Sequence, residues 1–170
     1  KIYSPPKMYK FLHIPIQSAS NKILKDMNRP YKIEIVEEII NKFKKEFPDI
    51  TLATDIITGY PTETEEDHKL NLKFINEFRP DVLNISKFSS HKQTKAGKLI
   101  PLNTNIINKR TSELMELHRQ TAQQNKQKFL SQGLIEEAIA SSQLEGANTS
   151  RKAAKRMLLE KREPTNRGER

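Results

Sequence analysis

Five polar side chains among the first 86 residues lie in or just after short apolar runs, where they could bind or orient a ligand. They are His13, Gln17, Asp55, Asn84 and Ser86. If the runs are β-strands, alternation places these side chains on one face of a sheet and the apolar side chains on the other. Polar groups at the carboxyl ends of parallel strands form the active sites of barrels built from strands and helices. The same groups could instead be hydrogen-bonded residues of a sandwich core, so both interpretations stay open.

The elements that would position these groups follow a regular order. Apolar runs at residues 11–16, 50–57 and 82–86 predict strands. Between them, helical spacing predicts two helices whose apolar faces are Val36, Ile39, Ile40, Phe43 and Phe47 in the first, and Leu70, Phe74, Ile75 and Phe78 in the second. This order predicts an α/β fold, a partial (βα) barrel of three parallel strands with covering helices.

The stretch TDIITGYPTETEED, residues 54–67, connects the second strand to the second helix. Thr62 or Thr64, followed three residues later by Glu65 or Asp67, predicts a capping box. Acids in a first helical turn also favour the helix dipole, so the acidic cluster needs no catalytic role.

The sequence changes character after Ser86. A long, mostly polar helix is expected from about residue 106 to 130, a second amphipathic helix after Gly133, and a third after Asn148. We therefore divide the chain into residues 1–130, a partial barrel with a basic C-terminal helix, and residues 131–170, a helical segment.

The net charge of +9 is unevenly distributed. Between Lys92 and Lys128 basic residues strongly outnumber acidic ones, as expected for a phosphate-binding face, although a solvated helix surface has the same composition. The residues that we expect to bind RNA are Lys92, Lys95, Lys98, Lys109 and Arg110.

The chain contains no cysteine, which excludes disulfides and iron–sulfur ligation by its own thiolates. No apolar run reaches the roughly 18 residues of a membrane span, and the opening KIYSPPKMYK lacks the order of a signal peptide. We expect a soluble, cytoplasmic protein without a metal site or a membrane partner.

Three stretches resemble the second half of the radical S-adenosylmethionine methylthiotransferases, most closely the subgroup acting on threonylcarbamoyladenosine in tRNA. They are HIPIQSASNKILKDMNRPY, ATDIITGYPTETEED and NISKFSSHKQTKAGKL, and the resemblance covers about residues 9–129. It implies a radical SAM barrel, S-adenosylmethionine and 4Fe–4S clusters as cofactors, tRNA as partner, and cofactor-binding roles for Gln17, Ser18, Asp55, Gly59 and Ser86.

This sequence also departs from the family pattern. Ala19 and Thr62 stand where the family has glycine, Asn21 where it has aspartate, and His91, Lys92 and Gln93 where it has Arg-Pro-Gly. Without cysteines the chain is interpreted as a fragment of a transferase that lacks its iron–sulfur half, has no catalytic residue of its own and is inactive alone. The alternative is an RNA-binding module without chemistry.

The last part of the chain, about residues 134–170, resembles the N-terminal inhibitory-helix region of Fic-type AMP-transferases. The matching positions are Ser141, Glu145 and Gly146. The resemblance implies a regulator of AMP transfer, although the catalytic loop of that family is absent from the sequence.

Overall fold

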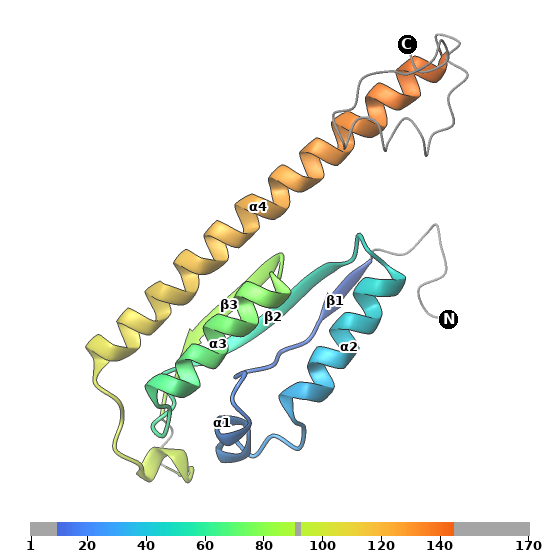
Figure 1. Ribbon diagram of the computed structural model, residues 1–170. Helices are drawn as coiled ribbons and strands as arrows, with labels where there is room; N and C mark the ends of the chain where they lie inside the picture. Colours follow the sequence, from blue (N-terminus) through green and yellow to red (C-terminus); the bar gives the residue numbers. More distant parts are fainter. Residues whose placement is uncertain (1–9, 91–92, 145–170) are drawn as a thin grey trace. The chain divides into compact units, whose positions relative to one another are not determined.

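The structure, a computed structural model, describes residues 10–90 and 93–144, with side chains described as far as residue 125. The chain divides into two compact units, residues 1–122 and 123–170. The first unit contains a parallel sheet with helices along it, shown in Figure 1. In the second unit a helix is described, and beyond residue 125 only its backbone.

The sheet has three parallel strands in the order β1–β2–β3. β1 (Phe11–His13) pairs with the start of β2 (Thr51–Thr58), and β2 pairs with β3 (Val82–Lys87) from Ala53 to Thr58. The predicted fold class is confirmed. The first strand is shorter than expected, because Pro15 has no N–H to donate, and pairing resumes only at an isolated bridge between Gln17 and Ile56.

Two helices form from the predicted periodic segments. α2 (Ile33–Glu46) buries Ile33, Val36 and Ile40, and it ends before Phe47 and Pro48. α3 (Glu65–Phe78) begins with the predicted capping box between Thr64 and Asp67, and it ends at Arg79, whose φ is 43°. A short helix that we did not expect, α1 (Asn21–Asp26), follows β1.

Two predicted core positions are wrong. Ile39 is 37% exposed and Leu70 is 43% exposed. On α3 the buried face is shifted, because Asp67, His68 and Asn71 are buried beside Phe74, Ile75 and Phe78. Helical spacing of apolar side chains does not reveal these polar residues as part of the buried face.

The apolar core lies between the sheet and the helices. Leu52 and Ile56 of β2 are fully buried there with Ile40, Ile75 and Leu114. The opposite face of the sheet carries the more exposed His13 and Asn84, and the partly exposed Asp55. This confirms the predicted division of each strand into an apolar and a polar side.

α4 (Thr104–Leu144) follows a single 3₁₀ turn, η1 (Ala96–Lys98). The predicted break at Gly133 is wrong, since the helix continues through it; one glycine costs a helix only about 1 kcal/mol. Our division of the chain at residue 131 stays a prediction. In the part of the chain that is described, no helix combines the length and apolar character needed to cross a membrane.

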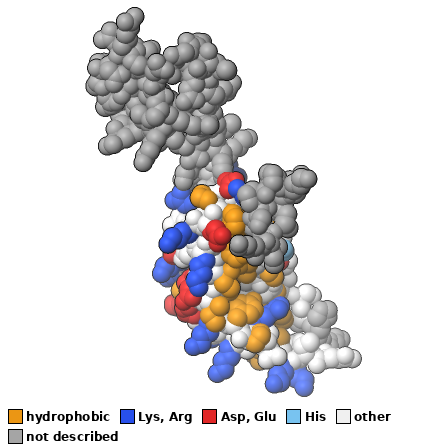
Figure 2. Space-filling view, turned by 90° about the vertical axis from the view of Figure 1, so that its right-hand side faces the viewer, with side chains coloured by type: hydrophobic (Ala, Val, Ile, Leu, Met, Phe, Trp, Pro, Cys, Tyr) orange, Lys and Arg blue, Asp and Glu red, His pale blue; other side chains and the backbone are white. Residues whose placement is uncertain are grey.

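The first unit exposes several large apolar side chains. Among them are Phe11 on β1 and Ile35 on α2, which are 46% and 53% exposed. Figure 2 shows a band of hydrophobic side chains on the face in view, with Lys and Arg side chains around it. Within the described residues β1 is an edge strand, so its outer backbone groups face no further strand.

Candidate functional site

The polar face of the sheet brings three of the predicted side chains into contact. Asp55 lies opposite Asn84 in the register, and its Oδ1 accepts a hydrogen bond of 2.8 Å from Asn84 Nδ2. Its Oδ2 lies 3.1 Å from His13 Nε2. We call His13, Asp55 and Asn84 the polar-face cluster. The sequence pattern placed all three on one face, and Asp55 remains partly exposed for a ligand.

Gln17 lies beside this cluster in a left-handed conformation, with φ of 65°. Its backbone N donates to Asp55 O, and its O accepts from Ile57 N, each at 2.9 Å. A glutamine at positive φ is strained, and such strain persists where neighbouring structure fixes it. The two β2 contacts provide that fixation, so the loop after β1 has a defined shape.

The neighbouring Ser18 does not face this site. It is 1% exposed, donates to Asn71 Oδ1 at 3.4 Å and accepts from Ser20 N at 3.1 Å. The cofactor-binding role expected of Ser18 stays a prediction; in the structure its hydroxyl bonds to Asn71 and to the backbone of Ser20. Serine next to a strained residue is as suited to shaping a turn as to binding a ligand.

Gly59 directly follows β2 and has a φ of 80°. A Cβ at this position would lie 2.6 Å from Ile107 Cγ1 on α4, so both the backbone and the space favour glycine. Its N donates to Glu63 Oε2 at 2.7 Å. The residue shapes the turn at the carboxyl end of β2.

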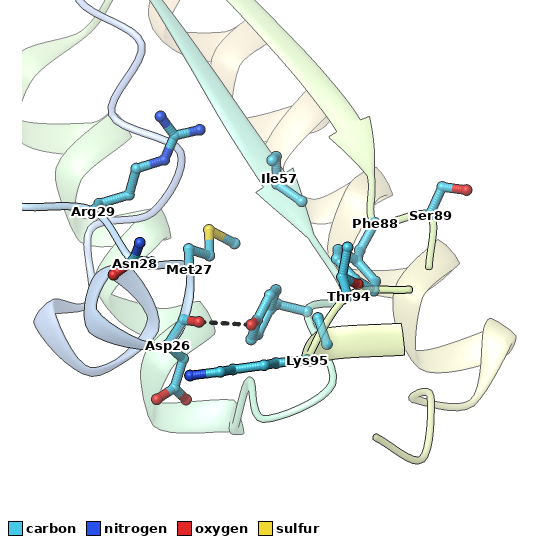
Figure 3. Close-up of a pocket in the computed structure, with 11 residues that line it drawn as sticks. Asp26, Met27, Asn28, Arg29, Ile57, Phe88, Ser89, Thr94 and Lys95 are labelled. Carbon is cyan, nitrogen blue, oxygen red and sulfur yellow. Dashed lines mark hydrogen bonds between the residues drawn. The ribbon is translucent and has the colours of Figure 1, made fainter. Parts of the chain in front are cut away.

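A pocket of about 370 Å³ opens at the carboxyl ends of β2 and β3. We call it the rim pocket; Figure 3 shows Ile57 and Phe88 from the strand ends, Met27 from the segment after α1, and Arg29 and Lys95 at the margins. Tyr60 and Phe88 meet edge to face with ring centroids 5.0 Å apart. The pocket thus combines an aromatic and aliphatic wall with cationic side chains.

Tyr60 is fixed by its hydroxyl, which donates to Asp26 O at 2.8 Å. Burial, and to a lesser degree the negative charge of Asp26, raises the pKa of Tyr60 above its usual value. The phenol therefore remains protonated and keeps this hydrogen bond.

The rim pocket adjoins predicted site residues. Asp55 lies two positions before Ile57 on the same face of β2, and Ser86 lies opposite Ile57 in the register. Arg29, Tyr60 and Phe88 were not chosen from the sequence, although all three belong to or follow the quoted motifs. Only the fold brings them together from three loops.

The expected RNA-binding residues have different surroundings. Lys95 borders the rim pocket, Lys98 is exposed at the end of η1, and Lys109 is exposed with its Nζ 3.7 Å from Glu113 Oε1. Lys92 lies outside the described residues. These lysines, Lys92 apart, are available to a polyanion.

Arg110 is buried, unlike the three exposed lysines, and its expected RNA-binding role stays a prediction. It is 5% exposed, and Nη1 donates to Glu63 O and Glu63 Oε1, both at 3.1 Å, while Nη2 lies 3.5 Å from Glu65 Oε2. It falls four residues before the buried Leu114, which belongs to the apolar core of the first unit. That spacing could have indicated its burial.

Glu63 and Arg110 belong to a larger set of charged groups under α4. His68 is fully buried and its Nε2 donates to Glu113 Oε2 at 2.8 Å, while its Nδ1 lies 4.0 Å from Glu63 Oε1. Burial raises the pKa of Glu63, against the opposing effects of Gly59 N and Arg110. We call Glu63, His68, Arg110 and Glu113 the buried network.

The residues present do not fit an iron–sulfur cluster. The chain has no cysteine, and within the described ranges no group of three acidic or histidine side chains could hold a metal ion. Thiolates are the usual ligands of such clusters.

The three expected regulatory positions lie where no side chain is described. Ser141 lies in the part of α4 whose side chains are not described, and Glu145 and Gly146 lie outside the described residues. The Fic-type resemblance stays a prediction, to which the comparisons below give no support.

Comparison with known proteins shows which family the chain resembles. Residues 6–75 match the model of the radical SAM superfamily. The chain is 41% identical over 132 residues to a probable threonylcarbamoyladenosine tRNA methylthiotransferase of Archaeoglobus fulgidus, and 42% identical over 117 residues to a threonylcarbamoyladenosine tRNA methylthiotransferase of Xenopus laevis. These matches cover 78% and 69% of this chain, but only 31% and 21% of the relatives.

Two further comparisons concern the substrate and the fold. A tRNA-2-methylthio-N(6)-dimethylallyladenosine synthase of Petrotoga mobilis is 39% identical over 133 residues, covering 76% of this chain and 30% of the relative. Coproporphyrinogen III oxidase (HemN) of Escherichia coli, a radical SAM enzyme, superposes with a TM-score of 0.55 at 20% identity, over 66% of this chain and 27% of that one. The latter likeness concerns the fold alone.

The chain thus spans less than a third of the curated relatives it matches. Residues 6–75 form part of a radical SAM domain, and the chain is homologous to threonylcarbamoyladenosine tRNA methylthiotransferases.

Proposed function

We propose that this chain supplies the S-adenosylmethionine-binding rim of a radical SAM transferase that methylthiolates threonylcarbamoyladenosine in tRNA. One observation carries the proposal: the rim pocket opens at the carboxyl ends of β2 and β3, and Asp55 lies two positions before its lining residue Ile57, within the segment that matches the radical SAM superfamily. In strand–helix barrels this end carries the chemistry. The homology supplies the reaction class.

The described residues fit S-adenosylmethionine. Ile57, Met27 and Phe88 offer an apolar surface for the adenine ring, and Asp55 offers a carboxylate that can accept hydrogen bonds from ribose hydroxyls. Arg29, with its planar fork of donors, suits the methionyl carboxylate. In this family the cofactor supplies the methyl group and, on reduction, a 5′-deoxyadenosyl radical.

The iron–sulfur clusters that the family uses require ligands from outside this sequence. We therefore expect no turnover by the 170-residue chain alone. A cysteine-bearing part of the same enzyme would complete the site. The edge of β1 and the exposed Phe11 and Ile35 offer it a β-pairing and apolar surface.

Lys95, Lys98 and Lys109 support tRNA as the partner. Their side chains are exposed, and Lys95 places positive charge at the margin of the rim pocket. Phosphate contacts of this kind position an RNA without reading its sequence. A tRNA substrate corresponds to a cytoplasmic location, and an RNA-binding module without chemistry would use the same lysines.

Binding of S-adenosylhomocysteine, measured by calorimetry on the intact chain, tests the cofactor proposal. Asp55→Asn and Arg29→Gln should each weaken binding about tenfold, since each removes a charged partner of the ligand. Arg119→Gln, which removes an exposed arginine paired with Glu116, should leave binding unchanged. Absence of binding by the wild-type chain, or equal binding by all variants, would overturn the proposal.

The reaction itself is tested by adding the cysteine-bearing part of a homologous enzyme together with iron, sulfide, a reductant and S-adenosylmethionine. Mass spectrometry of the tRNA nucleosides should detect the methylthio derivative of threonylcarbamoyladenosine. A methylthio product on dimethylallyladenosine instead would reassign the substrate, and no product on either nucleoside would leave the binding module as the better interpretation.

A further inference from the structure

The buried network lies directly beneath the turn that leads from β2 to α3. Two of its members, Glu63 and Arg110, have side chains that are 1% and 6% exposed. Charged groups are costly to bury unless they are paired and hydrogen-bonded. The cofactor and RNA proposals use neither side chain, so their burial requires another explanation.

The two oxygens of the Glu63 carboxylate hold different parts of the protein. Oε2 accepts from Gly59 N at 2.7 Å, and Glu63 N donates to Tyr60 O at 2.8 Å, which closes the turn of residues 59–63 on itself. Oε1 accepts from Arg110 Nη1 at 3.1 Å, and the same Nη1 donates to the Glu63 carbonyl. One guanidinium thus fixes both ends of Glu63.

The turn matters for the rim pocket because it carries Tyr60. Tyr60 lines the pocket, meets Phe88 edge to face and bonds the carbonyl of Asp26 across it. A shift of the turn would move this ring. We propose that Glu63 and Arg110 are positioning residues, which hold the turn of residues 59–63 and with it Tyr60 in the shape that the rim pocket requires.

The position of Arg110 on α4 gives this arrangement a second anchor. Thr111 next to it shares a hydrogen bond of 2.9 Å with Thr58 at the end of β2, and Ile107 one turn earlier contacts the space at Gly59. The first turns of α4 therefore support the turn along its length. Preorganising a binding surface in this way improves affinity by reducing the ordering that a ligand must impose.

The acid–base behaviour of Glu63 provides a signature. Its carboxylate is faced by Arg110 from α4 and by His68 from α3. Arg110 in turn contacts Glu65, and His68 contacts Glu113. Burial raises its pKa. If the ionised carboxylate holds the turn, affinity at the rim pocket falls as the pH drops through this raised pKa, and Glu63→Gln removes that fall.

A measurement without ligand tests the positioning role directly. Nuclear magnetic resonance of the intact chain should show amide exchange at Gly59 at least about tenfold faster in Glu63→Gln and Arg110→Met, with shifted Tyr60 and Phe88 ring signals. Signals of Leu52 and Ile40 in the core should stay in place. Arg110→Lys should show a smaller change than Arg110→Met, because lysine keeps the positive charge but lacks the forked donors of the guanidinium.

Arg119→Met is the matched control, since it removes an exposed arginine from the same helix. If Arg110→Met fails to fold, Glu63→Gln and Arg110→Lys decide the question. Wild-type exchange at Gly59 and wild-type Tyr60 signals in these variants would overturn the proposal, as would equal changes throughout the core.

Titration with S-adenosylhomocysteine adds a functional readout that rests on the proposed function. Glu63→Gln and Arg110→Lys should bind about tenfold more weakly than the wild type. If the wild-type chain does not bind this probe, the cofactor proposal fails, while the exchange and ring measurements still decide the positioning role. Equal affinities beside a binding wild type would overturn the role at the pocket.

Discussion

The polar-face cluster and the buried network contain the same kinds of side chain in opposite surroundings. Asp55 is partly exposed and is bonded to one amide and one imidazole, whereas Glu63 is buried and has both oxygens committed to the backbone and to Arg110. The first arrangement leaves a carboxylate that a ligand can approach. The second uses its charge entirely within the protein.

The difference shows that a residue's charge and its position in a motif do not tell whether its side chain binds a ligand or holds the protein's own structure. Lys95 and Arg110 both belong to the basic part of the chain, yet Lys95 borders the rim pocket and Arg110 anchors the turn beneath it. Gly59 lies between the two regions, since it directly follows β2 at the rim and faces Ile107 of α4. Changing it should affect both.

Replacement of Gly59 by alanine should have the largest effect on stability. We expect the free energy of unfolding to fall by about 2–4 kcal/mol, from positive φ and from the clash with Ile107. Urea denaturation measures the change. In an Ile107→Ala background the cost of Gly59→Ala should drop to about 1–2 kcal/mol, the share due to φ. Equal costs in both backgrounds would show that α4 does not confine the turn.

Asp67 offers a test through pH. Burial opposes its ionisation, but hydrogen bonds from Lys22, Ser20 and Thr64 outweigh it and lower the pKa from 3.8 to about 2. The pKa of Asp67 is lower in the folded than in the unfolded chain. Its contribution to the free energy of unfolding is therefore fully present at pH values above 3.8 and is lost as the pH falls towards 2. It amounts to about 2 kcal/mol.

Denaturation midpoints of the wild type and Asp67→Asn, measured across this acid range, check the prediction: the variant should be less stable near neutrality and should lose less on acidification. Asp49→Asn is the matched control, because Asp49 is also paired with a lysine but is exposed, and exposed pairs contribute little. Equal acid sensitivity of the wild type and Asp67→Asn would contradict the assignment.

The sequence predicts those features that local spacing determines. Alternation placed Asp55 and Asn84 on one face, and the three-residue interval from Thr64 to Asp67 gave the capping box. It did not predict the rim pocket, whose walls come from segments far apart in the chain. Arg110 was assigned by charge, although its spacing from Leu114 was the better indicator, because the partner that buries it lies 47 residues away.

Replacing a single exposed lysine should have the smallest effect, because such a lysine contributes to RNA binding and not to the buried network. Lys98→Gln should weaken binding of an anticodon stem-loop RNA only a few-fold and reduce the slope of log affinity against log salt by about 1, since one phosphate contact is lost. Lys42→Gln, which changes an exposed lysine on α2, should leave both quantities unchanged. Fluorescence anisotropy over a salt series measures both. Lys98 is exposed and takes no part in the buried network, so Lys98→Gln should keep the amide exchange rate at Gly59. Glu63→Gln, which changes the partner of the buried Arg110, should alter that rate. If the Lys98→Gln chain showed the salt dependence of the wild type, Lys98 would not belong to the RNA-facing surface.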